Sequence, residues 1–227
     1  MANSITAKVW RALGSINTYF DVDFGSAVPI QVLALAGAVI GATDTIRHKL
    51  SAISVGGSEL YDSGSLTGVN PNYECHFNVL SAQVSPRYWR CEINAASLAA
   101  QGYFDIGRAW AGPFWQPLRN FSFNNTEDFD DTSRLTAGLK SGAEYVDIGP
   151  QYRVRDFALN FMRGTDMDNA KELARYAGVR QQVLFIPNPS SSKLQTEGLI
   201  GRLRKTSPMS NPAFNLYSKS YQIYESL

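Results

Sequence analysis

Short segments in which apolar and polar residues alternate recur along the first half of this chain. They are YFDVDF at Tyr19–Phe24, TIRHKLSAI at Thr45–Ile53 and YWRCEI at Tyr88–Ile93. A period of two places successive side chains on opposite faces of a β-strand, and Gly, Ser, Asn and Pro fill the gaps between the segments. Short strands at this spacing are typical of an antiparallel sandwich. We therefore predict a β-sandwich for the first part of the chain.

Two apolar segments add to this pattern. PIQVLAL at Pro29–Leu35 predicts a buried strand, and Gly102–Ala109 predicts another. The apolar stretch from Val28 to Ile40 is too short to span a bilayer and contains Gln31 and Gly37. The opening MANSITAKVW has no apolar core, so we expect no signal peptide. We expect the protein to fold in a reducing cytoplasm without inserting into a membrane.

The character of the sequence changes after Gly112, which is followed by proline. We predict two domains, at 1–112 and 113–227. Residues 120–150 are polar, acidic near their start and interrupted by glycines, which is typical of a long hairpin or extended loop. Tyr152–Met162 alternates again and predicts the clearest strand of the second half.

One short helix is predicted at about 167–177. Thr165 or Asp166 can cap its start, Leu173 and its neighbours give apolar residues at helical spacing, and Gly178 ends it. Three more strands follow, at Gln182–Ile186, Gly198–Leu203 and Leu216–Tyr224. The predicted fold class is mainly β, with an N-terminal jelly-roll β-sandwich and a C-terminal β domain that carries one short α-helix.

Charge and cysteine content exclude several functions. Lys and Arg number 21 and Asp and Glu 20, for a net charge of +1, so no global field attracts nucleic acid or an anionic membrane. The basic cluster of Arg202, Arg204 and Lys205 is short and typical of a solvated face or an interface. Cys75 and Cys91 do not form a disulfide framework. Two buried free thiols fit best, and pairing across neighbouring strands stays an alternative.

The sequence contains no recognisable catalytic or cofactor motif. It lacks a phosphate-binding loop, a dinucleotide glycine fingerprint, His-Glu-x-x-His and Gly-x-Ser-x-Gly. His48 alternates with apolar residues, as a structural strand histidine does. His76 follows Cys75, and no second Cys/His pair stands at metal-ligand spacing. We predict no catalytic, cofactor-binding or metal-binding residues and no enzyme activity.

The densest group of carboxylates is the acidic run of Glu127, Asp128, Asp130 and Asp131. Clustered oxygen ligands on a loop can hold calcium, and a pair of carboxylates can hydrolyse a glycosidic bond. The run lacks the alternating order and closing Glu of a calcium loop. We expect a solvated loop, with calcium binding and glycosidase activity as alternatives.

Aromatic side chains that can stack on sugars are a second candidate feature. They are Trp10, Trp89, Trp110, Trp115, Tyr103, Phe104 and Phe114. Most stand at strand spacing, where packing in the core is expected. Trp110, Phe114 and Trp115 lie near the predicted boundary and suggest packing between the two domains. No stripe of aromatics interleaved with arginines predicts binding of single-stranded nucleic acid.

Two stretches of the first half carry a family resemblance. The first, from Val9 to Ser51, joins YFDVDFG, PIQVLALAG and TIRHKLS, and the second joins YWRCEI to GYFDIGRAWAG. Their order and spacing resemble the galactose-binding-like, discoidin-type β-sandwich. Sugar-binding members of that class use polar and aromatic residues on loops at one end of the barrel. No matching set is found in this sequence, so the ligand-binding residues are not predicted.

The second half resembles a family of phage and prophage tail proteins that carry the same kind of first domain. The resemblance lies in FWQPLRNFSF, SRLTAGLKSG, YRVRDFALNFM, AGVRQQVLFIPNP, GLIGRLRKTSP and the final FNLYSKSYQIYESL. It implies a tail-tip or baseplate component near the distal tail protein, with a tail-tube-like β-sandwich as C-terminal domain. It also implies a homo-oligomeric ring of three- or six-fold symmetry. The implied partners are the tail tube, tape measure and hub, in a virion assembled in the cytoplasm of the host bacterium.

Three hypotheses about function follow. The main hypothesis is a structural subunit of a long-tailed bacteriophage that forms a ring at the distal end of the tail tube. The alternative is a lectin-like, carbohydrate-binding module that recognises host surface glycans. The third is a glycan hydrolase that depends on Asp128 or Asp130, against which the missing catalytic motifs argue.

Overall fold

The chain folds into two compact units made mainly of β-strands, which confirms the predicted fold class. The computed structural model describes residues 10–13, 17–38, 40–41, 43–67, 74–98, 102–123, 125–137 and 144–226. Unit 1 contains Met1–Phe114 and Phe185–Leu199, and unit 2 contains Trp115–Leu184 and Ile200–Leu227. The segment Phe185–Leu199 therefore groups with the first unit, which a single division at residue 112 does not describe.

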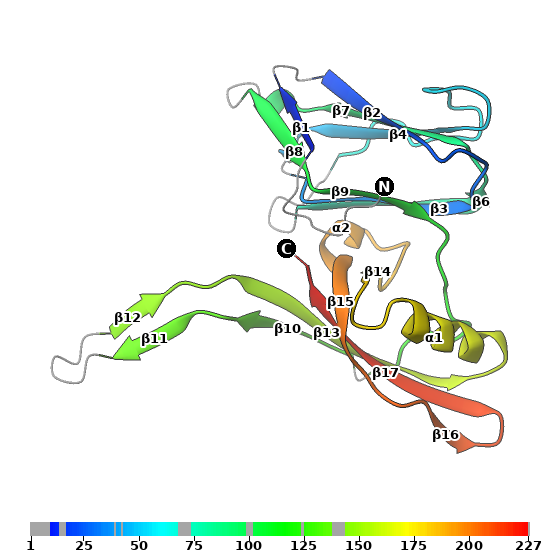
Figure 1. Ribbon diagram of the computed structural model, residues 1–227, viewed down its shortest axis with the longest axis vertical. Helices are drawn as coiled ribbons and strands as arrows, with labels where there is room; N and C mark the ends of the chain where they lie inside the picture. The colour runs from blue at the N-terminus through cyan, green and yellow to red at the C-terminus, as the bar shows by residue number, and fades with distance from the viewer. Residues whose placement is uncertain are drawn as a thin grey trace. The chain divides into compact units, whose positions relative to one another are not determined.

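Unit 1 is a sandwich of two sheets (Figure 1). The four-stranded sheet has the order β2–β7–β4–β5 and the three-stranded sheet the order β6–β3–β9, while β1 pairs with β8. The strands are β1 (Trp10–Leu13), β2 (Asn17–Asp23), β3 (Ile30–Ala36), β4 (Thr45–Ser51), β5 (Tyr61–Asp62), β6 (Cys75–Val84), β7 (Tyr88–Asn94), β8 (Tyr103–Ile106) and β9 (Arg108–Gly112), with a 3-10 turn η1 (Ala96–Leu98). Alternation in β4 and β7 turns their apolar side chains toward the second sheet and their polar side chains outward.

The core of unit 1 lies between these sheets. Its members include Ile30, Leu33, Leu35, Ile46, Leu50, Leu80, Trp89, Cys91, Ile93, Phe104 and Ile106. The central strand β3 pairs with β6 on one side and with β9 on the other, and six of its seven residues, on both faces of the strand, are buried. Its near-continuous apolar run, rather than an alternating one, suits that position.

Two strands of unit 1 differ from the prediction. The strand expected at Gly102–Ala109 is divided at Gly107, because β8 pairs with β1 and β9 pairs with β3. The chain therefore changes sheets at this glycine. The strand expected at Thr45–Ile53 ends at Ser51, whose Oγ accepts a hydrogen bond from the amide of Ile53 at 3.1 Å and so begins a turn.

The short helix α2 (Leu194–Glu197) covers part of the edge strand β6. The Gln195 Oε1 accepts a hydrogen bond from the Phe77 amide at 2.8 Å, and its Nε2 donates to the Phe77 carbonyl at 2.7 Å. The side-chain amide thus takes the place of a neighbouring strand at this residue. This pairing is the physical reason why Phe185–Leu199 groups with unit 1.

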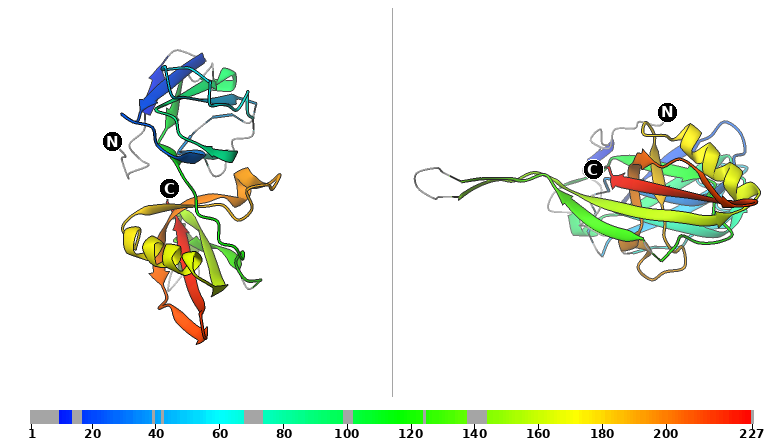
Figure 2. Two further views of the ribbon diagram at one scale, coloured as in Figure 1. Left: turned by 90° about the vertical axis from the view of Figure 1, so that its right-hand side faces the viewer. Right: turned by 90° about the horizontal axis from the view of Figure 1, so that it is seen from below.

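Unit 2 is built on one six-stranded sheet and a helix (Figures 1 and 2). The sheet has the order β10–β13–β17–β15–β14, and β16 pairs with β17. The elements are β10 (Thr126–Asp131), β11 (Arg134–Ala137), β12 (Glu144–Asp147), β13 (Gln151–Met162), α1 (Thr165–Tyr176), β14 (Gln182–Phe185), β15 (Leu199–Thr206), β16 (Ser210–Ala213) and β17 (Leu216–Glu225). The Tyr221 hydroxyl donates to the Ala170 carbonyl at 3.1 Å and ties α1 to the buried face of the sheet.

Helix α1 begins two residues before the predicted range and has no side-chain cap. Its N-cap is Gly164, at a φ of 49°. Asp166, one of the two predicted caps, instead accepts hydrogen bonds from Trp115 Nε1 at 3.2 Å and from the Leu118 amide at 2.9 Å. The helix ends before Gly178, where a φ of 49° suits the glycine. No helix in the described part of the chain is long and apolar enough to cross a membrane.

A long hairpin lies in the range where one was predicted (Figure 2). Strand β10 pairs with β13, and β11 pairs with β12. Between the two ladders the Thr132 hydroxyl donates to the Pro150 carbonyl at 2.8 Å, so the hairpin is continuous. We call residues 126–137 and 144–148 the arm. Beyond Thr132 the arm is two strands wide in the residues that the structure describes.

Candidate functional site

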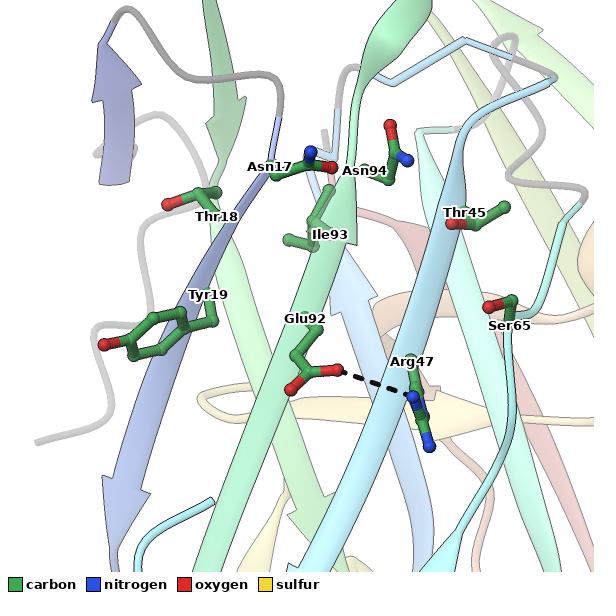
Figure 3. A pocket seen from close by; sticks show the side chains of 9 residues that line it. All are labelled: Asn17, Thr18, Tyr19, Thr45, Arg47, Ser65, Glu92, Ile93 and Asn94. Atoms are coloured by element: carbon green, nitrogen blue, oxygen red, sulfur yellow. Dashed lines mark ion pairs between the residues drawn. The ribbon is translucent and has the colours of Figure 1, made fainter.

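A polar depression lies on the outer face of the four-stranded sheet of unit 1 (Figure 3). Strand register sets two rows of three side chains across β2, β7 and β4: Asn17, Asn94 and Thr45, then Tyr19, Glu92 and Arg47. The two rows share one face because side chains two residues apart on a strand point the same way. Ser65 borders the depression, which has a volume of ≈ 340 Å³.

Ion pairs hold the second row in place. The Arg47 guanidinium lies 2.6 Å from the Asp62 carboxylate and 4.0 Å from Glu92. Lys49 Nζ donates to Glu92 at 2.6 Å. Glu92 thus stands between two cations, and its carboxylate is oriented before any ligand arrives.

Tyr19 supplies the aromatic surface of the depression. The Arg90 guanidinium lies over its ring, 4.0 Å from the ring centre, and also donates to Asp21 at 2.7 Å. This stacking fixes the plane of an otherwise exposed ring. A ligand therefore meets a ring whose orientation is already set.

The charges of this face are stabilised by their pairing. The hydrogen bond from Arg47 lowers the pKa of Asp62 to about 2, and the same bond raises the pKa of Arg47. The hydrogen bond to Asp21 raises the pKa of Arg90. These groups stay ionised across the neutral range, so they offer fixed charges rather than a proton donor and acceptor poised near neutral pH.

The depression is suited to binding a neutral ligand rich in hydroxyl groups. Its amides and hydroxyls donate and accept hydrogen bonds, its carboxylate accepts them, and its phenol ring offers an apolar surface. Such convergence of a few polar groups beside an aromatic surface is characteristic of small-molecule sites. None of its lining residues was predicted as a site residue. Asn17 and Asn94 come from distant parts of the sequence, and only the pairing of β2 with β7 brings them together.

The acidic run identified in the sequence lies on strand β10 and not on a loop. Strand alternation puts Asp128 and Asp130 on one face and Glu127 and Asp131 on the other. Glu127 forms an ion pair with Arg155 of β13. The described residues contain no group of three or more His, Cys, Asp or Glu side chains placed to hold a metal ion.

The two histidines meet inside unit 1. The rings of His48 and His76 stack with their centres 5.4 Å apart, and Trp89 Nε1 donates to His48 Nδ1 at 3.2 Å. Burial lowers the pKa of both rings, that of His76 to about 4, and His76 adds to the lowering at His48. Cys75 and Cys91 are buried and are not joined by a disulfide, which confirms the favoured prediction for them.

The aromatic residues considered as sugar-stacking groups fall into two classes. Trp89 and Phe104 are core residues. The others lie partly or fully at the surface of their units: Trp10, Tyr103, Trp110, Phe114 and Trp115. Arg108 lies over the Trp110 ring at 4.3 Å. None of these aromatics lines the depression, whose aromatic residue is Tyr19.

The arm of unit 2 is the second candidate surface. Its apolar side chains are unusually exposed: Leu135 at 64%, Val146 at 62% and Ile148 at 86%. Leu135 and Val146 are paired across the hairpin and lie on one face, while Tyr145 lies on the other. A two-stranded hairpin is marginally stable in water, and clustered exposed apolar side chains mark contact surfaces. The arm is therefore suited to binding another protein.

Comparisons with known proteins add little to this description. No protein-family model and no curated protein matches the sequence. A solved structure titled CpGH89CBM32-6, produced by Clostridium perfringens, is similar at 14% identity over 49% of this chain and 82% of its own, with a TM-score of 0.34. An f-lectin (fucolectin) from striped bass (Morone saxatilis) serum is similar at 10% identity over 99% of this chain and 88% of its own, with a TM-score of 0.37. Both TM-scores are below 0.5, so the description of unit 1 as a β-sandwich rests on its own strand order and core.

Proposed function

We propose that the protein is a structural, non-enzymatic subunit that joins a larger assembly through the arm of unit 2. The observation that carries this proposal is the exposed apolar face of Leu135 and Val146 on a hairpin only two strands wide. Burial of apolar surface is favourable by roughly 25 cal/mol per Å². A partner that covers this face therefore stabilises the complex relative to the free arm.

The sequence resemblance to phage tail proteins supplies the setting of the proposal. In that setting the protein is a tail-tip or baseplate component of a virion, assembled in the bacterial cytoplasm as a ring of three- or six-fold symmetry. Each arm then contacts the next copy through a different surface, and closure of the ring sets the copy number. The tail tube, tape measure and hub are the proposed neighbours.

Light scattering on the purified full chain tests this assembly. We expect a mass several times that of one chain, and a return to the monomer mass when Leu135 and Val146 are both replaced by Asp. A matched control is Ile53→Asp, which changes an equally apolar and exposed side chain of unit 1. A monomer at high concentration contradicts the ring, and absence of the protein from purified phage particles contradicts the tail-tip setting.

A second function, glycan binding by unit 1, is favoured by the depression on its four-stranded sheet. The name f-lectin describes only the similar protein. For this chain, the support is the row of Asn17, Asn94 and Thr45 beside the oriented ring of Tyr19. Glycan-array binding tests the proposal. We expect binding to fall at least tenfold in Asn94→Ala and Tyr19→Ala and to persist in Asp23→Asn, which lies on the same sheet face but outside the depression. An array without hits contradicts it.

A further inference from the structure

The stacked histidines of unit 1 belong neither to the arm nor to the lining of the depression. His48 belongs to β4 of the four-stranded sheet and His76 to β6 of the three-stranded sheet. Their rings stack at an interplanar angle of 26°, and both residues are at least 99% buried. The contact therefore joins the two layers of the sandwich directly, where apolar side chains are the rule.

The contact requires His48 to be neutral. Trp89 Nε1 is an N–H group and can only donate, so His48 Nδ1 must accept and the ring proton must sit on Nε2. An imidazolium carries a proton on both nitrogens. Protonation of His48 therefore places an N–H group on Nδ1, opposite the N–H group of Trp89, so the hydrogen bond is lost and two donors face each other. A second proton on His76 adds repulsion between two stacked cations in the apolar interior.

No carboxylate that the structure describes is paired with either imidazole. Among the described residues, neither histidine forms an ion pair. The buried carboxylate of Asp44 accepts hydrogen bonds from Ser97 and the Gly41 amide. From β7, Cys91 stands opposite His48, and burial raises the pKa of its thiol. From β5, the Tyr61 hydroxyl is hydrogen bonded with Asn78 of β6.

The remaining polar atoms agree with this picture. His48 Nε2 and both ring nitrogens of His76 have no hydrogen-bond partner in the described residues. A buried imidazole without acceptors for its N–H groups is destabilised further by a positive charge. The environment of the pair thus opposes protonation from every side.

We propose that His48, His76 and Trp89 form an acid-sensitive lock between the two sheets of unit 1, closed while both imidazoles are neutral and opened when they are protonated. The sign follows from linkage. Burial lowers the pKa of both rings below the ordinary 6.5, so the opened state binds more protons than the closed state. Opening is therefore favoured as pH falls from about 6.5 toward about 4, where His76 also titrates in the closed state.

The histidines and the surface carboxylates of unit 1 affect stability in different pH ranges. The pKa of Asp62 is about 2, and hydrogen bonds from Arg87 and Arg11 lower those of Asp23 and Asp105. Those groups weaken the fold only at more acidic pH, below their ordinary value of 3.8. The pKa of Glu59 is lowered as well, from an ordinary value of 4.5, by a hydrogen bond from Ser51. Acid opening between pH 6.5 and about 5 is thus assigned to the histidine pair.

Proton NMR of the full chain tests the lock directly, because the protein has only two histidines. We expect neither imidazole resonance of the folded protein to titrate between pH 7.5 and 5.5. Hydrogen exchange of β4, β6 and β7, corrected for intrinsic rates, should report an opening equilibrium that rises by up to about 100-fold per pH unit, as two protons require. A histidine that titrates near pH 6.5 in the closed state overturns the proposal.

A double variant provides the matched control. His48→Gln keeps an acceptor for Trp89 Nε1 but cannot be protonated, and His76→Leu removes the second charge while it keeps a buried apolar side chain. We expect the pH dependence of opening between pH 6.5 and about 5 to be lost in this variant. An unchanged slope overturns the assignment. Should the variant not fold, the wild-type titration and exchange measurements decide alone.

Discussion

The two units bury their polar groups in opposite ways. Unit 1 places two neutral imidazoles, His48 and His76, between its sheets. Unit 2 buries a charged pair instead, in which Arg153 Nε donates to Glu225 at 2.9 Å from the neighbouring strand β17. A buried neutral group destabilises the fold when it gains a charge. A buried charged pair destabilises the fold when one partner is removed, because the other charge stays unpaired. The same mainly β architecture therefore has two different weak points.

The exposed surfaces differ as well. On the outer sheet face of unit 1, Asp21, Asp62 and Glu92 each lie beside an arginine or lysine, so the face is satisfied by its own chain. On the arm of unit 2, apolar side chains such as Leu135 lie open to solvent. The charged groups of the unit 1 face are already paired, so this face does not need a ligand for its stability. The apolar side chains of the arm, in contrast, have no second layer to cover them.

The largest expected effect is the removal of one member of the buried pair in unit 2. Glu225→Ala leaves the Arg153 guanidinium buried without its carboxylate, and we expect the free energy of unfolding of unit 2 to fall by about 3–5 kcal/mol. Urea denaturation measures it. Glu172→Ala breaks the exposed pair with Arg175 and should leave the unfolding midpoint nearly unchanged. Equal effects of the two changes contradict the comparison.

A smaller effect is expected when unit 1 loses the hydrogen bond to its neutral imidazole. Trp89→Phe keeps an aromatic ring but leaves His48 Nδ1 without a donor, which should cost about 1–3 kcal/mol. The pKa of His48 should rise at the same time, because the donor that opposes protonation is gone. Denaturation and NMR titration measure the two effects. Trp10→Phe, at a partly exposed ring, serves as control and should change neither quantity appreciably.

Acidification should weaken the outer face of unit 1 only slightly. The pKa of Asp62 is held at about 2 by Arg47, so its contribution is present above the ordinary value of 3.8 and is lost as pH falls toward 2. The pair is partly exposed, and we expect it to contribute less than about 1 kcal/mol to the free energy of unfolding. Denaturation of wild type and Asp62→Asn at pH 5 and pH 2.5 measures this contribution. The loss of unfolding free energy in Asp62→Asn should be greater at pH 5, and a greater loss at pH 2.5 contradicts the prediction.

The smallest expected effect on folding is at the arm. Leu135→Asn replaces a largely exposed side chain, so the free energy of unfolding of unit 2 should change by less than about 0.5 kcal/mol. The apparent mass of the assembly should fall nonetheless. Denaturation of the monomeric protein measures the free energy of unfolding, and light scattering measures the mass of the assembly. A large loss of folding stability instead places Leu135 in the core of unit 2 and removes the contrast with unit 1.

Much of the fold was predictable, and the exceptions have physical causes. Strand β6 was missed because its sequence, CHFNVLSAQV, is buried at four successive positions and so does not alternate. The sequence TEDFDD of strand β10 predicts a loop because it is acidic and poor in strand-forming residues, yet pairing with β13 makes it a strand. The candidate site was missed because its polar side chains are ordinary strand residues until register aligns them.

The sequence by itself determined the mainly β class, most strand positions, the short helix near residues 167–177 and the two buried thiols, because periodicity and turn residues act locally. Only the tertiary structure decided which residues meet. It placed His48 against His76, Asn17 beside Asn94, and Gln195 on the edge of β6. Each contact joins segments that are distant along the chain, so it depends on sheet order and register. Those in turn are fixed by how the whole core packs, and no short stretch of sequence encodes them.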